Sequence, residues 1–503
     1  MCEDGSYRGA ETKERAYAIP STCVARKGHD VNVPSFQFFA FVLVGAALYN
    51  SSKLPAWRQA IWLIANLSFL ASFSTDPPAF LPLTGFLFFG FLSVRVLQIG
   101  RAPLLFVMIV LALLLWLFWL KKYTFIPDNV FITSPYVTIG LSYVFFRVMH
   151  LVIDTHQRAI GSALRPIEYV NYTLNFTSLV SGPIQRYQDY RRMQYDNPLA
   201  LDEFIIGKAI ERIILGFFKV SVVSMVLLHE HKVAISAFDQ VQPLVWKILT
   251  AMSIIAIYPL FLYFNFSGYT DAVIGSARLF RLELPENFDR PFTSENFIHF
   301  WSRWHITLSG WLKAYVYIPL LMGLMRRYES PQWEPYFGAF AFFVTFFLVG
   351  AWHGQTSEFL FFGVLQGAGV SLNKLYQIHM TTILHRKGYR LLCDNPLYRA
   401  LSRGLTFTWF AFTLLWFWSD WGRVATFGQT LGASGIAIAL GALVVGSTVI
   451  LSFGMTLNAL VDRSTLASSR YLRTAIATGE LTVLTTLNAL LDSPTPEIVY
   501  KAF

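Results

Sequence analysis

The sequence predicts an all-α integral membrane protein, and three observations support this prediction. Of the 503 residues, 54% are hydrophobic and only 14% are charged, and the mean hydropathy is +0.47. A soluble protein of this length needs far more charge on its surface, whereas spanning helices need charge only in loops and working sites. About eleven apolar runs approach the ~17–20 residues that cross a hydrocarbon core. They lie at 35–50, 59–74, 79–99, 103–120, 132–153, 204–228, 245–267, 337–353, 357–378, 405–418 and 430–457.

Two further stretches are apolar and aromatic but interrupted: 166–184 contains Gly and Pro, and 293–322 contains Arg, Gly, Pro and His. We expect them to form re-entrant or interfacial helices, because irregular backbone at membrane depth must be covered by protein or line a cavity. Residues 1–33 are polar and lack the apolar core of a cleavable signal, so they are predicted to form an N-terminal tail. The remainder, 34–503, is predicted to be one polytopic domain.

Loop charges predict an orientation, because Lys and Arg concentrate on the cytoplasmic side of a membrane protein. If the runs alternate, the loops at 75–78, 121–131, 229–244 and 419–429, which carry few cations, lie outside, and so does the turn after His353. The cation-rich loops then face the cytoplasm. Their cations are Lys53, Arg58, Arg95, Arg101, Arg158, Arg165, Arg186, Arg191, Arg192, those from Arg278 to Arg327 and those from Arg386 to Arg403.

The net charge of +10 could suggest nucleic acid as a partner, but no soluble basic domain or RNA-binding signature is present. The positive-inside distribution explains the charge better. Three distant cysteines, Cys2, Cys23 and Cys393, form no CxxC pair, so neither a disulfide framework nor a thiolate metal site is indicated. His229-Glu230-His231 is not an HExxH motif, and no metal site is predicted.

The segment 285–320 contains the first candidate for chemistry, His305. Thr293, Ser294 and Glu295 form a helix-start signal. After it, side chains recur at helical spacings of three and four on one apolar face. They are Trp301, Trp304, His305, Leu308 and Leu312. Arg303 lies on another face, where it could meet phosphate or lipid headgroups. The alternative is an interfacial helix anchored by tryptophans, with His305 bonded to a carbonyl.

The second candidate is His353, which ends the uncharged apolar run FVTFFLVGAWHG. Ionisable groups at membrane depth are costly and by default mark function or a specific partner. An imidazole, with an ordinary pKa of ~6.5, can take up and return a proton near neutral pH. A buried, uncharged His353 would therefore suit general-base catalysis. The alternative is a core histidine bonded across helices to Asp271 or Ser309.

Two other groups are weaker candidates. Asp271 follows the small-residue stretch 265–270 and either orients a histidine or marks a membrane boundary. His150 and Asp154 are four residues apart, on one helix face, and a structural pair is the preferred interpretation.

Several ordered motifs together closely resemble the membrane-bound O-acyltransferase family. They are LVSGPIQRY, YFNFSGYTDAVIGSARLF, PENFDRPF, FWSRWHITLSGWLKAYVYIPL and LVGAWHG, and the likeness covers about 140–375. Within the family the chain is similar to a bacterial branch that includes the alginate O-acetyltransferase membrane subunit and the D-alanyl transfer protein of teichoic acid synthesis. The resemblance implies a central tunnel, with His353 as the principal catalytic histidine and His305 as the second, on the cytoplasmic side.

The resemblance also implies the reaction: a cytosolic acyl thioester, from acetyl-CoA or a phosphopantetheine carrier protein, would acylate a hydroxyl acceptor, with no bound cofactor. Substrate contacts are expected from Trp352, Asn265, Ser309, Arg303, Trp304 and Asp271, and Arg290 and Lys313 could also hold donor phosphates. The expected acceptor is an envelope or extracellular polysaccharide, with an extracytoplasmic partner protein, at a bacterial cytoplasmic membrane. D-alanyl or longer acyl transfer to a wall polymer or lipid is the first alternative. A transporter with a histidine proton relay is the second.

Overall fold

The structure is a computed structural model that describes residues 33, 35–100, 102–123, 126–132, 136–161, 163–462 and 469–491. Regular secondary structure in these ranges is helical, and the only β-type contact described is an isolated antiparallel bridge between Phe288 and Trp304. The all-α prediction is confirmed. The predicted tail and Arg101 lie outside the described residues, apart from Val33.

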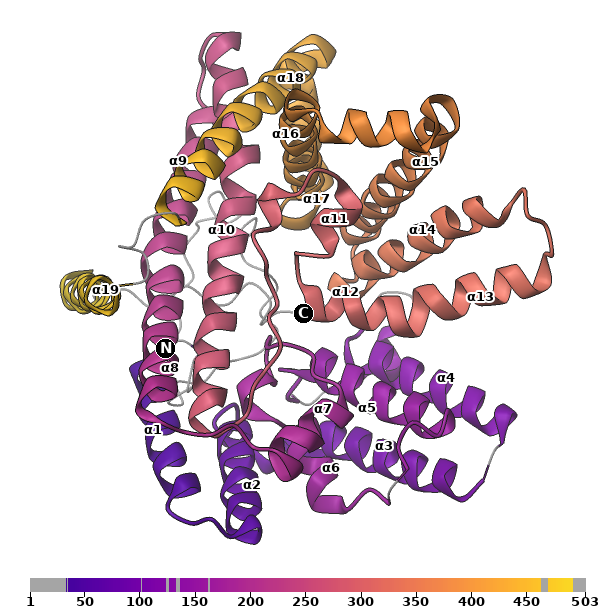
Figure 1. Ribbon diagram of the computed structural model, residues 1–503, viewed down its shortest axis with the longest axis vertical. Coiled ribbons are helices and arrows are strands. Elements are labelled where there is room, and N and C mark those ends of the chain that lie inside the picture. Colours follow the sequence, from indigo (N-terminus) through magenta and orange to yellow (C-terminus); the bar gives the residue numbers. More distant parts are fainter. Residues whose placement is uncertain are drawn as a thin grey trace, which may run out of the picture.

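The α-helices, coloured along the chain in Figure 1, alternate with short 3₁₀ and π segments. They are α1 (Phe36–Asn50), α2 (Pro55–Ala71), α3 (Leu81–Ile99), α4 (Pro103–Leu120), α5 (Leu141–His156), α6 (Pro166–Thr173), α7 (Tyr187–Arg191), α8 (Glu203–Phe218), α9 (Ser224–Asp239), α10 (Leu244–Leu279), α11 (Phe297–Trp301), α12 (Ile306–Leu312), α13 (Ile318–Arg327), α14 (Glu334–His353), α15 (Ser357–Asp394), α16 (Pro396–Thr413), α17 (Leu415–Trp418), α18 (Trp421–Asp462) and α19 (Arg470–Leu491). The 3₁₀ segments are η1 (Pro77–Phe80), η2 (Asp128–Val130), η3 (Phe176–Ser178) and η6 (Pro291–Thr293), and the π segments are η4 (Arg192–Asp196), η5 (Lys219–Val223) and η7 (Lys313–Tyr317).

The long helices α8 and α10 run side by side along one side of the molecule (Figure 1). Near one end of this pair lie α1, α2, α6 and α7, and near the other lie α9, α16 and α18. The helices α13 and α14 extend away from the pair, above α3, α4 and α5 in this view. The break that carries His305, between α11 and α12, lies in the middle of this arrangement.

Seven helical segments of the described chain are long and apolar enough to cross a membrane. They are Pro77–Ile99, Pro103–Leu120, Glu203–Asp239, Leu244–Leu279, Ile306–Arg327, Glu334–His353 and Trp421–Leu460. A multi-pass membrane protein is therefore supported, while the count of about eleven spans stays a prediction. One of the seven, Ile306–Arg327, falls largely within a stretch predicted as re-entrant, and the run 132–153 becomes helical only at Leu141.

The hairpin of α14 and α15 fixes the position of His353. A Cβ atom added to Gly350 would lie 2.4 Å from the backbone of Gly363, and one added to Gly363 would lie 2.6 Å from the carbonyl oxygen of Phe347. Only glycine permits this approach of two backbones, which is how membrane helices pack most closely. The end of α14 is thus held against the start of α15.

The stretch 166–184 forms α6, the short η3 and irregular backbone, and nearly all of it after Glu168 is buried. The buried guanidinium of Arg147 donates to the carbonyl oxygens of Thr173 (2.8 Å) and Ser178 (2.6 Å). The irregular backbone at this depth is therefore covered by protein and bonded from α5.

Candidate active site

His305 lies at a helix break. The helix α11 ends at Trp301, α12 begins at Ile306, and His305 caps α12 with left-handed backbone angles (φ 46°, ψ 52°). The expected helix from Thr293 through Leu312 is therefore wrong: α11 begins after Asn296, whose side chain accepts a hydrogen bond from the amide of His299 (2.9 Å). The predicted apolar face is nevertheless buried on both sides of the break.

The motif PENFDRPF causes the break, because its backbone bonds to the segment that would otherwise be helical. The amide of Ile306 donates to the carbonyl oxygen of Asn287 (2.9 Å), and the amide of Asp289 donates to that of Arg303 (3.0 Å). These two bonds flank the bridge between Phe288 and Trp304. A tertiary contact thus replaces the local helical bonds here.

The side chain of Asn287, fully buried, determines which nitrogen of His305 carries a proton. Its Oδ1 accepts from the amide (3.2 Å) and the hydroxyl (2.9 Å) of Thr307, and it lies 3.1 Å from Nδ1 of His305. The two bonds from Thr307 identify the atom facing the ring as the amide oxygen, which has no hydrogen to donate, so Nδ1 of His305 donates. In the neutral ring, Nε2 then carries the lone pair.

His353 is the last residue of α14 and is 3% exposed. The indole of Trp352 contacts both candidate histidines, with ring centroids 4.5 Å from His353 and 6.4 Å from His305. His305 and Lys121 are also close enough to act electrostatically on His353. The structure therefore brings the two predicted histidines together around one tryptophan.

Lys121 and Tyr123 cap the helix end that carries His353. The ammonium of Lys121 donates to the carbonyl oxygen of Trp352 (3.0 Å), and the hydroxyl of Tyr123 donates to that of Ala351 (2.6 Å). The last carbonyls of a helix lack intrahelical partners, and a cation there is favoured by the helix dipole. Burial lowers the pKa of Lys121 to about 8.

The model of the membrane-bound O-acyltransferase family matches residues 103–399, which is more than half of the chain. The chain belongs to this family. Membership confirms the acyltransferase class that the motifs predicted. The matched range includes the predicted core at 140–375 and extends beyond it on both sides.

Three bacterial proteins are similar to this acyltransferase. The teichoic acid D-alanyltransferase of Bacillus subtilis is 25% identical over 75% of this chain and 96% of its own length. The probable alginate O-acetylase of Pseudomonas fluorescens is 28% identical over 48% of this chain and 46% of its own length. The peptidoglycan O-acetyltransferase of Helicobacter pylori is 33% identical over 44% of this chain and 39% of its own length. The chain thus spans less than half the length of the latter two.

Most of the residues expected to contact substrate in this acyltransferase lie near His305. Trp304 and Asn265 are buried, and Asn265 precedes Phe266, whose ring centroid is 4.9 Å from that of His305. The hydroxyl of Ser309 donates to the carbonyl oxygen of Trp304 (3.3 Å). Arg303 points elsewhere, as expected for another face, and its guanidinium donates to Thr293 (2.8 Å).

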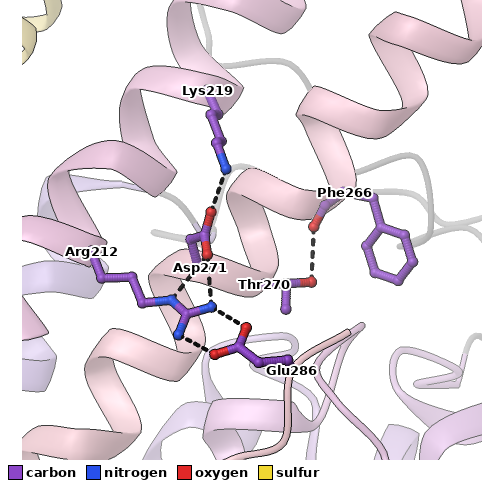
Figure 2. A network of polar contacts seen from close by, with 6 residues as sticks. All are labelled: Arg212, Lys219, Phe266, Thr270, Asp271 and Glu286. Atoms are coloured by element: carbon purple, nitrogen blue, oxygen red, sulfur yellow. Dashed lines mark hydrogen bonds and ion pairs between the residues drawn. The ribbon is translucent and has the colours of Figure 1, made fainter. Parts of the chain in front are cut away.

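Asp271 belongs to a separate charge network (Figure 2). One of its carboxylate oxygens accepts from Arg212 (2.9 Å) and the other from Lys219 (2.6 Å), and Arg212 also binds Glu286 (2.6 Å). The network joins α8, η5, α10 and the loop after α10. These contacts give Asp271 a role in helix packing, whereas the sequence left open that it orients a histidine.

His150 and Asp154 form a structural cluster in α5. The Nε2 atom of His150 accepts from the amide of Tyr187 (2.9 Å), and Asp154 accepts from Tyr315 (2.9 Å) and Gln188 (2.6 Å). The histidine and the carboxylate lie 3.6 Å apart. These bonds join the segment 179–187 to the helices around it, in agreement with the preferred structural interpretation.

Sequence reasoning missed Asn287 and Lys121 as residues of the site. Asn287 lies in the motif PENFDRPF, but a contact 18 residues along the chain produces no helical periodicity. Lys121 follows an apolar run directly, where a lysine usually marks only the membrane boundary. Its bond to Trp352 spans 231 residues, so only the folded chain reveals it.

Proposed function

We propose that this acyltransferase moves an acetyl group from a cytosolic thioester to a hydroxyl of an envelope or extracellular polysaccharide. The observation that carries the proposal is the meeting of His353 and His305 around Trp352. The loop charges predict that the two ends of the site lie on opposite sides of the membrane. The names of two relatives, a probable alginate O-acetylase and a peptidoglycan O-acetyltransferase, support the acceptor class.

In the proposed reaction His353 is the general base. Its imidazole takes the proton of the acceptor hydroxyl while the hydroxyl oxygen bonds to the thioester carbonyl carbon. The carbonyl becomes an oxyanion, the tetrahedral intermediate collapses, and the carbon–sulfur bond breaks. The proton then passes from His353 to the departing thiolate. The products are an ester and a free thiol, and the imidazole is restored.

His305, with its Nδ1 proton held by Asn287, is proposed to position the thioester. Asn265 and Ser309 are the proposed oxyanion donors, each worth a few kcal/mol if aimed at the transition-state oxygen. Trp352 and Trp304 would line the path of the acyl chain and exclude water, which limits hydrolysis. Arg303 would contact the donor phosphates.

The donor is proposed to be acetyl-CoA or a carrier protein bearing phosphopantetheine, and the acyltransferase is proposed to work in a bacterial cytoplasmic membrane with an extracytoplasmic partner protein. D-alanyl transfer to a wall polymer is a second candidate function. It is favoured by the match to the B. subtilis D-alanyltransferase, which extends over 96% of that protein.

The test is acyl transfer by the purified protein in lipid vesicles, with labelled acetyl-CoA in one reaction and a D-alanyl-loaded carrier protein in another. We expect label in a polysaccharide acceptor from one donor, and the His353→Ala variant should lose at least about 100-fold in turnover. The exposed His379 in α15 provides the control, His379→Ala, which should keep full activity. Full activity of His353→Ala, or substrate flux without an acyl product, would contradict the proposal.

A further inference from the structure

A pocket of about 540 Å³ opens among the starts of α2 and α6 and the segment from α7 to Pro198. The loop charges predict that this end of the molecule lies on the cytoplasmic side. Four cations line the pocket: Lys53, Arg58, Arg165 and Arg191. They differ from Arg303, Arg290 and Lys313, which the sequence suggested for donor phosphates, so the pocket is not accounted for by the proposed reaction centre.

The pocket carries an excess of positive charge. Its one lining carboxylate, Glu168, accepts from Nε of Arg165 (2.8 Å) and from the hydroxyl of Tyr187 (3.3 Å). Four cations against one carboxylate leave a net charge of +3. Within the described chain, no ion pair involves Lys53 or Arg58. Arg58 donates from Nε to the carbonyl oxygen of Ser52 (3.1 Å) and lies over the ring of Tyr49, so its terminal nitrogens and the Lys53 ammonium are the groups offered to an anion.

The start of α2 adds to this charge. Pro55 and Ala56, the first two residues of α2, line the pocket, and the N-cap residue Leu54 offers no side-chain hydrogen bond to the first turn. Pro55 has no N–H, so Ala56 contributes the first-turn amide at the pocket, and this amide and the helix dipole favour an anion here. The helix α2 has 17 residues, enough for a developed dipole.

A further cation lies beside the pocket. Arg281, which follows α10, donates from Nε to the side chain of Asn50 (2.8 Å). Burial, and after it the nearby charge of Arg58, lower the pKa of Arg281. Like charges held this close raise the free energy of the folded chain, and a bound anion would lower it.

The pocket is also linked to His305 by one short segment. The amide of Ile184 donates to the hydroxyl of Thr307 (3.0 Å), two residues after His305, and Arg191 lines the pocket seven residues after Ile184. Three extended and four helical steps span at most about 16 Å. A ligand in the pocket therefore lies near the end of the site that His305 occupies.

We propose that this pocket binds a phosphate group, supplied either by an anionic lipid headgroup or by a phosphorylated thioester donor. The guanidinium groups that line the pocket and the ammonium of Lys53 can surround a phosphate with charge-assisted hydrogen bonds, and the amide of Ala56 can donate to a further oxygen. The donor source rests on the proposed function; the lipid source does not. In either case the phosphate is held on the cytoplasmic side of the histidine pair.

The experiment measures binding without turnover. The whole protein is placed in phosphatidylcholine nanodiscs and titrated with coenzyme A, and separately in nanodiscs of increasing phosphatidylglycerol content, with the shift in thermal unfolding as the readout. The pocket variant is Lys53→Gln with Arg58→Gln. The matched control is Arg386→Gln with Lys387→Gln, which removes the same charge from exposed positions of α15.

We expect the pocket variant to weaken binding of one probe by at least about tenfold, because two charge-assisted contacts are lost, and the control to bind as the wild type does. Weakened coenzyme A binding identifies the donor, and weakened phosphatidylglycerol binding identifies the lipid. If the double variant does not fold, Arg165→Gln, whose side chain is 60% exposed, replaces it. Failure of both probes to bind, or equal binding by pocket variant and wild type, overturns the proposal. His353→Ala should bind both probes as the wild type does. The binding measurement therefore does not depend on acyl transfer, and failure of the proposed function can be told apart from failure of this proposal.

Discussion

Replacing Asn287 by alanine tests whether the orientation of His305 matters for turnover. The Oδ1 atom of Asn287 holds the Nδ1 proton of His305 and also accepts two hydrogen bonds from Thr307. Alanine removes that acceptor and leaves three donors without it: the buried Nδ1 of His305 and the half-buried amide and hydroxyl of Thr307. The His305 ring can then adopt either tautomer and rotate.

The expected magnitude follows from these three contacts. A net value of about 1 kcal/mol for each hydrogen bond predicts a loss of about 3 kcal/mol in stability. Loss of a partner that orients a functional histidine typically costs about 10–100-fold in activity, by analogy with histidines that bind metals. Both effects are large enough to measure separately. The conservative variant Asn287→Asp keeps an acceptor at the same place and should retain the greater part of the activity.

The assay combines thermal unfolding with acyl-transfer kinetics in vesicles, below the unfolding temperature of each variant. We expect Asn287→Ala to lower kcat with a smaller effect on the KM of the acceptor, and Asn287→Asp to recover kcat. A purely structural role for Asn287 would change the unfolding temperature alone. Wild-type kcat in folded Asn287→Ala protein would refute the reasoning.

The other predictions concern the charge network and the cap on α14. Asp271→Ala should cost about 3–5 kcal/mol in stability, because Lys219, whose side chain is 18% exposed, is left without its carboxylate. The control is Asp189→Ala, at a side chain that is 48% exposed, which should cost less than about 1 kcal/mol. Equal losses in the two variants would count against the network. Lys121→Met should lower kcat by freeing the carbonyl of Trp352, and unchanged kinetics would reduce Lys121 to a boundary residue. Burial lowers the pKa of Lys121 to about 8 from its ordinary 10.5. Between these two pH values the unfolded chain binds more protons than the folded chain, so the free energy of unfolding rises with pH. Lys121→Met should flatten that rise in pH-dependent unfolding.

The predicted helix at 293–312 shows where reasoning from sequence ends. The apolar spacing correctly identified the buried face, since Trp301, Trp304 and His305 are all buried. It did not reveal the break, because spacing reports which side chains face the core and not which backbone bonds form. The break depends on the PENFDRPF backbone, whose bonds to Arg303 and Ile306 compete with the local helix.

Asp271 shows the same limit for charge. A carboxylate within an apolar run indicates a specific partner, and the sequence offered a histidine or a membrane boundary. The partners are Arg212 and Lys219, 59 and 52 residues away in the chain. The packing of α8 and η5 against α10 brings these cations to Asp271, and no periodic pattern within one helix predicts such a contact.

The sequence by itself determined the helical membrane class, the apolar runs, the two histidines and the family, because hydropathy, spacing and ordered motifs are local properties of the chain. The tertiary structure decided that His305 lies at a left-handed break, that Asn287 fixes its proton and that Lys121 caps the helix of His353. It also decided that cations within or just before α2, α6 and α7 gather around one pocket. Each of these depends on contacts between distant segments, and their free energy is set by the burial and geometry that only the folded chain provides.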